Sequence, residues 1–515
     1  MALAYFAEFG WEPLILKINP DEQEGIKDPE LCRTVPDEVK TWQAGCLPLW
    51  LTKWTGLRNI GLRSFFHLAK KGNRIIQQEK PQAVFFSTTM FSVMTLGRYW
   101  QRRHGIPYVL DFQDPWFKGR QGAESREENA ENRGQRAEVG SQKTKMDPQF
   151  RHLTQSPHPQ PLSHLMGEGG VGIPPNGAES GERRAENGGQ SSEVKSPTSG
   201  LRPPTFKGKL ADWVAGILEP YALRRAAHVV SVSPAYPVAF RARYSWLGEK
   251  DFTVLPFGAA ETDFEHLHAA PVRQTIFNPR DGKQHWVYVG RGGRDMNFSV
   301  RSFFAALARV LEKQPTLRPQ LMIHFIGTCY APKERALKTV EPLALEYGLG
   351  DVVIESTDRI PYFEALQCLL DSDALFIPGS DDPSYTASKL YPYILAKKPL
   401  LAVFHEASSV VEILKKTKAG TVVAFKTGES VETISKRILE SGWLPMTLQD
   451  DGRRTTDDGS RISNSRPPTS DLRPPVPATD WTAFAPYTAR EMTRQLCQVF
   501  DAIEKQKCSS LVYTA

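Results

Sequence analysis

The sequence lacks three features that would each have indicated a class of protein. No stretch of 18 or more apolar residues occurs in the 515 residues, so a membrane-spanning helix is not expected. The opening segment, Met1–Leu16, has neither a basic region nor a small-residue cleavage site, so export by the usual signal is not expected. The six cysteines are scattered without a CxxC pair, which indicates reduced thiols rather than disulfides or a zinc site. We therefore expect a cytoplasmic protein without a metal.

A large excess of one charge is also absent. The 64 Lys and Arg residues against 58 Asp and Glu residues leave a formal net charge of +6. This excess is too dilute for a dedicated DNA-binding protein, whose basic residues usually gather on one face. No nucleic-acid recognition motif appears, so no nucleic-acid partner is expected.

Apolar residues are scarce in one long segment. Residues Lys118–Thr205, 88 in number, include only 11 Leu, Ile, Val, Phe, Met, Trp or Tyr but 22 Gly or Pro. Such a composition buries too little apolar surface to offset the entropy of ordering, so we expect a disordered insertion. A segment at Gly122–Val139 is repeated at Gly177–Val194, which is typical of a mobile repeat inserted in a surface loop. A Pro-rich partner ligand is the alternative.

A second polar segment, near Thr447–Thr479, shares the motif PTS-x-LRPP with the first. We interpret it as a second disordered insertion. The domain prediction is then a first domain at 1–258 containing insertion 118–205, a linker at 259–283, and a second domain at 284–446. The prediction also includes an insertion at 447–479 and a C-terminal helix at 480–515 that packs back across the junction.

Outside the insertions, short apolar runs alternate with helical patterns. Near-continuous apolar strands separated by helices predict parallel sheets covered on both faces. We expect an α/β fold with two Rossmann-like, doubly wound domains facing across a cleft. The predicted strands are Ala83–Ser87, Tyr108–Phe112, His228–Ser233, Phe252–Pro256, Trp286–Gly290, Leu321–Gly327, Val352–Ser356, Ala374–Pro378, Leu400–Phe404 and Thr421–Phe425.

The segment Gly379–Val403 carries the strongest chemical signal. It follows a predicted strand, and Pro392 is tolerated only in a first helical turn, so a helix should begin near Ser388. Free amides at that helix end, the hydroxyls of Ser384, Thr386 and Ser388, and the charge of Lys389 would suit a diphosphate. An ordinary capped helix with a solvated lysine is the alternative.

Two further strand ends carry polar residues. The segment Tyr288–Asn297 places Gly290 and a glycine turn after a strand, with Arg291 and Arg294 beside it, which suits a phosphate. Asp111 and Asp114 follow another strand, where a general base or a substrate-orienting carboxylate is expected. The alternatives are a common glycine turn and a capped strand end.

Seven motifs in order give these signals a family context: LDFQDPW, HVVSVSPAYPVAFRARY, VLPFGAAETDF, YVGR, HFIG, RIPYFEALQCLLDSDALFIPGS and SKLYPYILAKKPLLAV. Together they resemble retaining GT-B glycosyltransferases, particularly family 4. The resemblance implies two Rossmann-like domains, a nucleotide-sugar donor on the C-terminal one, an acceptor on the N-terminal one, and no cofactor or metal.

Carried over by motif, the resemblance assigns substrate-binding roles. Arg291 matches the phosphate-contacting arginine; Ser388, Lys389 and Leu390 match the diphosphate-facing helix end; Arg359 lies in a neighbouring loop. The family's paired glutamates fall on Ser384 and Pro392, with Asp381 or Asp382 nearest to the first. We include Asp382 with Asp111 and Asp114 as candidate catalytic residues.

The beginning of the chain also bears on the resemblance. Leu3–Leu16 is similar to the family's first helix. This implies either further residues upstream or a first sheet without one central strand.

The segment Leu47–Arg74 has six basic residues and no acidic one. Its tryptophans and leucines fall near one helical stripe, which suits docking on the anionic inner face of a membrane. A helix packed into its own domain is the alternative.

We expect a glycosyltransferase that moves a sugar from a UDP-, GDP- or ADP-sugar to a cell-envelope polysaccharide or lipid-linked acceptor. The alternatives are a catalytically inactive GT-B-like binding protein and a sugar-nucleotide epimerase.

Overall fold

The computed structural model describes residues 2–22, 31, 34–52, 59–114, 116, 206–331, 335–383, 385–444 and 473–512. Both expected insertions lie almost wholly outside these residues. Chain contacts group 1–116 with 217–515 as one compact unit and 117–216 as a second, of which only the start of a helix is described. None of the described helices combines the length and apolar character needed to cross a bilayer.

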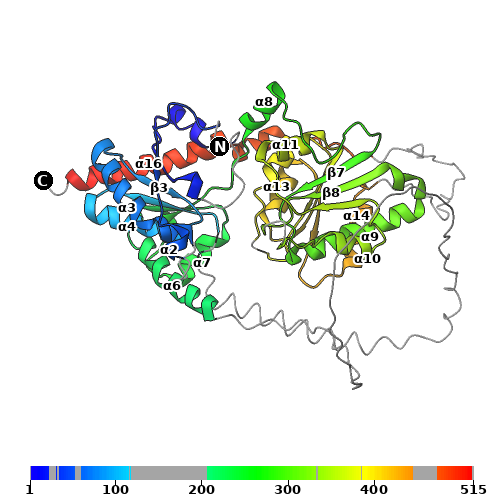
Figure 1. The fold of residues 1–515 in the computed structure, drawn as a ribbon, viewed down its shortest axis with the longest axis horizontal. Coiled ribbons are helices and arrows are strands. Elements are labelled where there is room, and N and C mark those ends of the chain that lie inside the picture. The colour runs from blue at the N-terminus through cyan, green and yellow to red at the C-terminus, as the bar shows by residue number, and fades with distance from the viewer. Residues whose placement is uncertain are drawn as a thin grey trace, which may run out of the picture. The chain divides into compact units, whose positions relative to one another are not determined.

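The first half of the chain contains a four-stranded parallel sheet (Figure 1). Its order is β3-β4-β5-β6, so each strand lies beside the next one in the sequence. A separate parallel pair joins β1 to β2. The strands are β1 (Ile15–Ile18), β2 (Thr41–Ala44), β3 (Val84–Ser87), β4 (Tyr108–Phe112), β5 (His228–Ser231) and β6 (Phe252–Val254). The helices are α2 (Leu49–Thr52), α3 (Ile60–Glu79), α4 (Phe91–His104), α6 (Phe206–Leu223), α7 (Ala235–Arg243) and α8 (Glu261–Ala269).

The second half contains a six-stranded parallel sheet of order β12-β11-β10-β7-β8-β9. Helices α9, α10 and α14 lie together on one face, while α11 and α13 lie toward the other (Figure 1). The strands are β7 (Gln284–Val289), β8 (Leu321–Ile326), β9 (Val353–Ser356), β10 (Ala374–Pro378), β11 (Leu400–His405) and β12 (Thr421–Phe425). The helices are α9 (Asn297–Lys313), α10 (Glu341–Glu346), α11 (Tyr362–Asp371), α12 (Leu390–Leu395), α13 (Ser409–Thr417) and α14 (Val431–Glu440).

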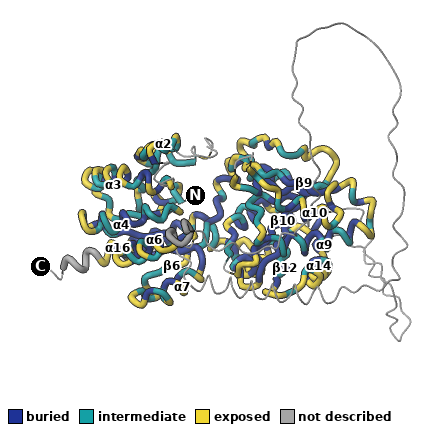
Figure 2. The backbone as a smooth tube through the Cα atoms, turned by 60° about the horizontal axis from the view of Figure 1, so that its bottom comes forward, coloured by how far each residue is buried: buried dark blue, intermediate teal, exposed yellow. Residues whose placement is uncertain are grey.

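Burial explains why these strands form. Every residue of β10 and β11 is buried, as the dark tube in Figure 2 shows for β10. Strands covered on both faces by helices carry continuous apolar runs, and these runs predicted the strands from sequence. The α/β architecture with parallel sheets is therefore confirmed.

Two predicted helices differ from the structure. Leu3–Leu16 is not a helix: two 3₁₀ turns, Ala2–Ala4 and Ala7–Phe9, are followed by β1. Gly10 ends the second turn with φ +79°, and Pro13 cannot donate an amide hydrogen bond to extend it.

The C-terminal helix is divided. It consists of α15 (Trp481–Phe484), a 3₁₀ turn containing Pro486, and α16 (Ala489–Val512). Helix α16 packs Leu496 and Phe500 into the core that contains Val109 of β4 and Val230 of β5.

Candidate functional site

The order in which strands are added to the six-stranded sheet reverses at β7. The chain runs from β7 to β8 and β9 on one side, and then returns to place β10 on the other side of β7. Loops that leave adjacent strands in opposite directions open a crevice at the carboxyl ends, where α/β proteins bind ligands. The two segments that the sequence singled out, Tyr288–Asn297 after β7 and Gly379–Lys389 after β10, are the loops on either side of this point.

A lysine from the second loop reaches the first. Nζ of Lys389 donates to the Tyr288 hydroxyl at 2.5 Å, and that hydroxyl donates to the Arg291 carbonyl at 2.7 Å. Gly290 makes this approach possible, because a Cβ atom there would lie 2.4 Å from Lys389 Nζ. Gly290 also has φ +154°, a conformation that other residues rarely adopt.

The two loops are further connected through their backbones. The Asp381 amide donates to the Asp295 carbonyl at 2.8 Å, and Ser299 Oγ donates to the Gly379 carbonyl at 2.8 Å. The two segments that the sequence singled out as suited to phosphate therefore lie side by side in the structure.

Surroundings lower the pKa of Lys389 from its ordinary value to about 7. The main cause is burial of the ammonium group, and the positive charges of Arg291 and Arg359 act in the same direction, while Asp295 opposes them. A lysine in this condition gains a proton readily when an anion arrives beside it.

Arg291 does not stand open to a ligand. Its Nη1 and Nη2 atoms donate to the two carboxylate oxygens of Asp295 at 2.7 and 2.8 Å. This bidentate pair raises the pKa of Arg291; Asp295 is partly buried, which favours its neutral form, but bonds from Arg291 and Ser380 outweigh this and lower its pKa. Sequence reasoning missed Asp295 as the partner, although the spacing of four residues was a visible signal.

Arg294 and Arg359 are both exposed. Arg294 begins a 3₁₀ turn at the end of the glycine loop. Arg359 stacks over the ring of Tyr330 at 4.5 Å, beside the end of β8. The positive charge of Arg359 helps to lower the pKa of Lys389.

The predicted helix end is weaker than the sequence indicated. Helix α12 has only six residues, so its dipole is small and the charges must come from side chains. Ser388 and Asp382 are exposed and Thr386 is half-buried, where it accepts from Ser409 Oγ at 3.3 Å. Leu390 is fully buried and its amide donates to Ala387, so it belongs to the core beneath the loop. Ser384 lies outside the described residues.

The two aspartates of the first half differ in environment. Asp111, the fourth residue of β4, is buried and accepts from Ser87 Oγ at 3.1 Å and Gln113 Nε2 at 2.8 Å. Burial raises the pKa of Asp111 despite these bonds, which favour its ionised form. Asp114 is exposed. Asp111 therefore has the more specialised environment.

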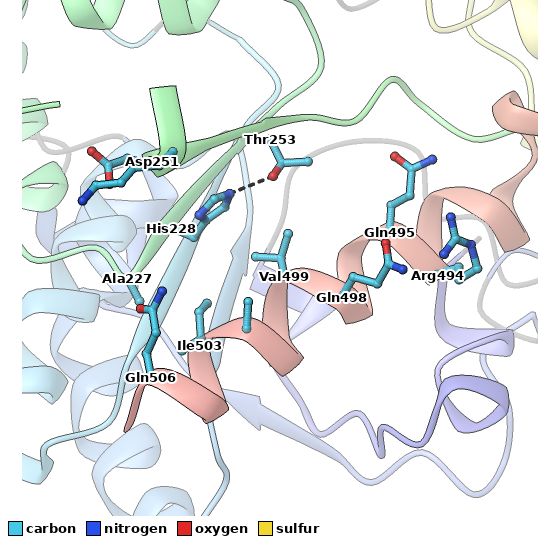
Figure 3. A pocket seen from close by; sticks show the side chains of 12 residues that line it. Ala227, His228, Asp251, Thr253, Arg494, Gln495, Gln498, Val499, Ile503 and Gln506 are labelled. Carbon is cyan, nitrogen blue, oxygen red and sulfur yellow. Dashed lines mark hydrogen bonds between the residues drawn. The ribbon is translucent and has the colours of Figure 1, made fainter. Parts of the chain in front are cut away.

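A separate hollow of about 560 Å³ lies beside α16 (Figure 3). His228 Nε2 and Thr253 Oγ1 are 2.8 Å apart in its wall. Both residues stand at the start of their strands, β5 and β6, the end opposite to that at which α/β sheets bind ligands. This hollow is therefore no candidate for the donor site. Across the described ranges, no three His, Cys, Asp or Glu side chains are grouped to hold a metal ion.

No protein-family model and no curated protein matches the sequence. Among solved structures, the chain is similar to a sucrose-phosphate synthase from Thermosynechococcus elongatus, with 12% identity over 100% of this chain and 92% of that one and a TM-score of 0.44. A glycosyltransferase from Rickettsia africae has 11% identity, 98% and 93% coverage and a TM-score of 0.47. Anabaena HepE in complex with UDP-glucose has 13% identity, 97% and 99% coverage and a TM-score of 0.42. Likenesses this distant say nothing of activity.

Proposed function

We propose that this protein is a glycosyltransferase that takes a sugar from a nucleotide-diphosphate donor, in the manner of retaining GT-B enzymes. The observation that supports it is the approach of Lys389 to Tyr288 over Gly290, at the switch point of the six-stranded sheet. The part-buried ammonium of Lys389, whose pKa the charges of Arg291 and Arg359 help to lower, matches a group that acquires negative charge as it leaves. A departing diphosphate is such a group, and positive charge placed beside it stabilises the transition state.

Arg291 joins this cluster by exchanging its partner. A diphosphate and the Asp295 carboxylate present similar pairs of oxygen atoms to a guanidinium group. We propose that the donor displaces Asp295 from Arg291, so that part of the binding free energy is spent in breaking the Arg291–Asp295 ion pair.

For the acceptor we propose a cell-envelope polysaccharide or a lipid-linked glycan, with the chain in the cytoplasm at the inner face of the membrane. Asp111 would orient or deprotonate the acceptor hydroxyl. Burial raises the pKa of Asp111 above the ordinary value for aspartate, which suits a group that accepts a proton.

Calorimetric titration with UDP-, GDP- and ADP-glucose tests the donor site. We expect one of them to bind the wild type, Arg291→Ala to bind it at least about tenfold more weakly, and Asp295→Asn to bind it more tightly, because one charge-assisted hydrogen bond contributes roughly 1.5–3 kcal/mol. Equal affinity in all three proteins would remove Arg291 from the donor site. Binding without transfer or donor hydrolysis would indicate the inactive sugar-nucleotide-binding protein instead.

Peripheral contact with an anionic membrane is also proposed, through one stripe of α3 and the neighbouring α2. Leu62 and Phe66 are exposed on α3, and Lys70 and Arg74 continue the same four-residue spacing. Trp50 of α2 is 73% exposed. Of the other predicted stripe residues, Leu68 is buried, Phe65 is half-buried and packs against the core, and Trp54 and Leu57 lie outside the described residues. Exposed aromatic side chains beside cations are typical of a surface that lies in a headgroup region.

Co-sedimentation with vesicles tests this surface. We expect binding to vesicles that contain phosphatidylglycerol, weaker binding to pure phosphatidylcholine, and loss of binding in the double variant Trp50→Ser/Phe66→Ser. Trp213→Ser is the matched control, because Trp213 is 65% exposed on a different helix, α6. An equal loss in the control would show that the α2–α3 stripe is not the membrane surface.

A further inference from the structure

A large cavity lies in the first half of the chain, between two strands that do not pair with one another. It has a volume of about 1610 Å³, and its wall includes all of β1 and all of β3. Strand β1 pairs with β2, and β3 pairs with β4; among the described residues neither has a second strand beside it. The cavity therefore separates two open sheet edges.

The hydrogen-bond registers show which backbone groups face the cavity. The Ile15 amide donates to Lys40 on the β2 side, and the Val84 amide donates to Pro107 on the β4 side, at 2.9 Å in each case. In a parallel strand, the amide and carbonyl of one residue point to the same neighbour and those of the next residue to the opposite side. Two residues of β1 and two of β3 consequently direct backbone donors and acceptors into the cavity: Leu16, Ile18, Phe85 and Ser87.

Most side chains on both faces of the cavity are apolar, although Glu12, Glu22 and Arg63 also line it. Helices α3 and α4 contribute side chains to the wall on one side, and α16 with the N-terminal 3₁₀ turns contributes side chains that pack on the other face of the sheet. Two hydrogen-bonding edges and two mostly apolar faces form the environment that surrounds an interior strand of a parallel β-sheet. The main apolar residues that line it are Phe6, Ile75, Ile76, Val93, Leu496 and Phe500.

We propose that this cavity is a binding slot for one extended apolar polypeptide segment that lies parallel to β1 and β3 and joins the two sheets into one seven-stranded sheet. Four or five residues would match the four residues of β1 and of β3. The slot is buried on both faces, so the segment is apolar throughout rather than alternating.

The occupant is a segment joined to the amino end of the chain. Ala2, Leu3 and Phe6 line the same cavity, so a strand in the slot reaches residue 2 through a short connection. The carboxyl end of such a parallel strand would lie at the edge where Ser87 and Asp111 stand, and both residues line the cavity. The inserted strand would therefore also complete the wall beside Asp111.

Hydrogen exchange of the existing chain is the first test. We expect amides of Leu16, Ile18, Phe85 and Ser87 to exchange at least about tenfold faster than those of Ile15, Lys17, Val84 and Phe86, because only the second set pairs with a strand. Uniform protection along β1 and β3 would show that the edges are already closed, and the proposal would be wrong.

The second test adds an occupant to the full chain. An amino-terminal extension of Val-Ile-Leu-Val-Val and a Gly-Ser-Gly connection should slow exchange at the four cavity-facing amides by at least about tenfold and raise the melting temperature. The control extension replaces the second and fourth residues by proline, which cannot donate to a ladder. Three outcomes would overturn the proposal: no added protection, protection only in oligomers by sedimentation velocity, or equal protection by the equimolar free pentapeptide, which would assign the slot to a separate chain.

Discussion

The Tyr393 hydroxyl accepts a hydrogen bond from the Val289 amide at 2.6 Å, so a residue of α12 closes the end of β7. The same hydroxyl lies 3.2 Å from the Val289 carbonyl, to which it donates. The arrangement fixes the last residue before the glycine turn to the helix that follows Lys389. The loop after β7 and the loop that carries Lys389 are thus connected at the strand end as well as through Lys389 itself.

Tyr393→Phe should lower the free energy of unfolding by about 1–3 kcal/mol, because a buried amide and carbonyl lose their partner. Tyr391→Phe on the same helix is the matched control. The Tyr391 hydroxyl is buried with no hydrogen-bond partner in the part of the chain that the structure describes, so its removal should cost little or stabilise. Urea unfolding of the two variants measures the difference. Equal effects would show that the Tyr393–Val289 contact is not a significant tie.

The pKa of Lys389 predicts how nucleotide binding depends on pH. In the free protein this pKa is about 7, so at pH 8 most of the lysine is neutral. A bound diphosphate favours the ammonium form and raises the pKa, so binding takes up a proton and affinity falls as pH rises above about 7. Calorimetry at pH 8 in buffers of different ionisation enthalpy should detect uptake of part of one proton. Lys389→Met should abolish that uptake and weaken binding, and uptake that persists in the variant would assign the proton to another group.

The sequence predicted the second sheet better than the first because of burial. Strands such as β10 and β12, whose predicted and observed bounds agree, lie in a sheet covered on both faces and carry apolar runs. Strands β1 and β2 have four residues each, and only Ala44 among them is buried, so they carry no such run and were missed. Segment length and periodicity cannot identify a short strand at a partly open edge.

At the site, the sequence identified the two loops but not how their side chains pair. Gly290 was identified from a glycine turn after a strand and Lys389 from a predicted helix start, and both loops converge at the switch point of the sheet. The pairing of Arg291 with Asp295 instead depends on side-chain rotamers, and the depth of Lys389 depends on the tyrosine ring beneath it. Neither the Arg291–Asp295 pairing nor the depth of Lys389 follows from residue spacing alone. Both determine which positively charged side chain is available to bind an anion.

Gly290→Ala should weaken nucleotide binding more than it weakens the fold. The added methyl would meet Lys389 Nζ, the flexible end of a side chain, so the lysine would move rather than the backbone. Gly282→Ala is the control: Gly282 also has a positive φ, +83°, but nothing lies within 4 Å of its Cβ position. We expect both variants to lose about 1 kcal/mol of stability through backbone strain, and only Gly290→Ala to lose donor affinity by calorimetry. Equal affinities would show that the displacement of Lys389 is unimportant.

Asp111→Asn should separate acceptor chemistry from donor binding. Asparagine keeps the size of the side chain and can still accept from Ser87, but it cannot take a proton. A general base contributes about 10²–10⁴-fold to a rate, so transfer should fall by that range while the Kd of the nucleotide stays unchanged. Asp114→Asn is the matched variant at an exposed position three residues further along the chain. Transfer by Asp111→Asn at the wild-type rate would remove Asp111 from the reaction, and a loss confined to Asp114→Asn would move the role to that residue.

Since burial raises the pKa of Asp111, a wild-type rate controlled by this group should rise with pH through a pKa above the ordinary value for aspartate, and that rise should be absent from Asp111→Asn.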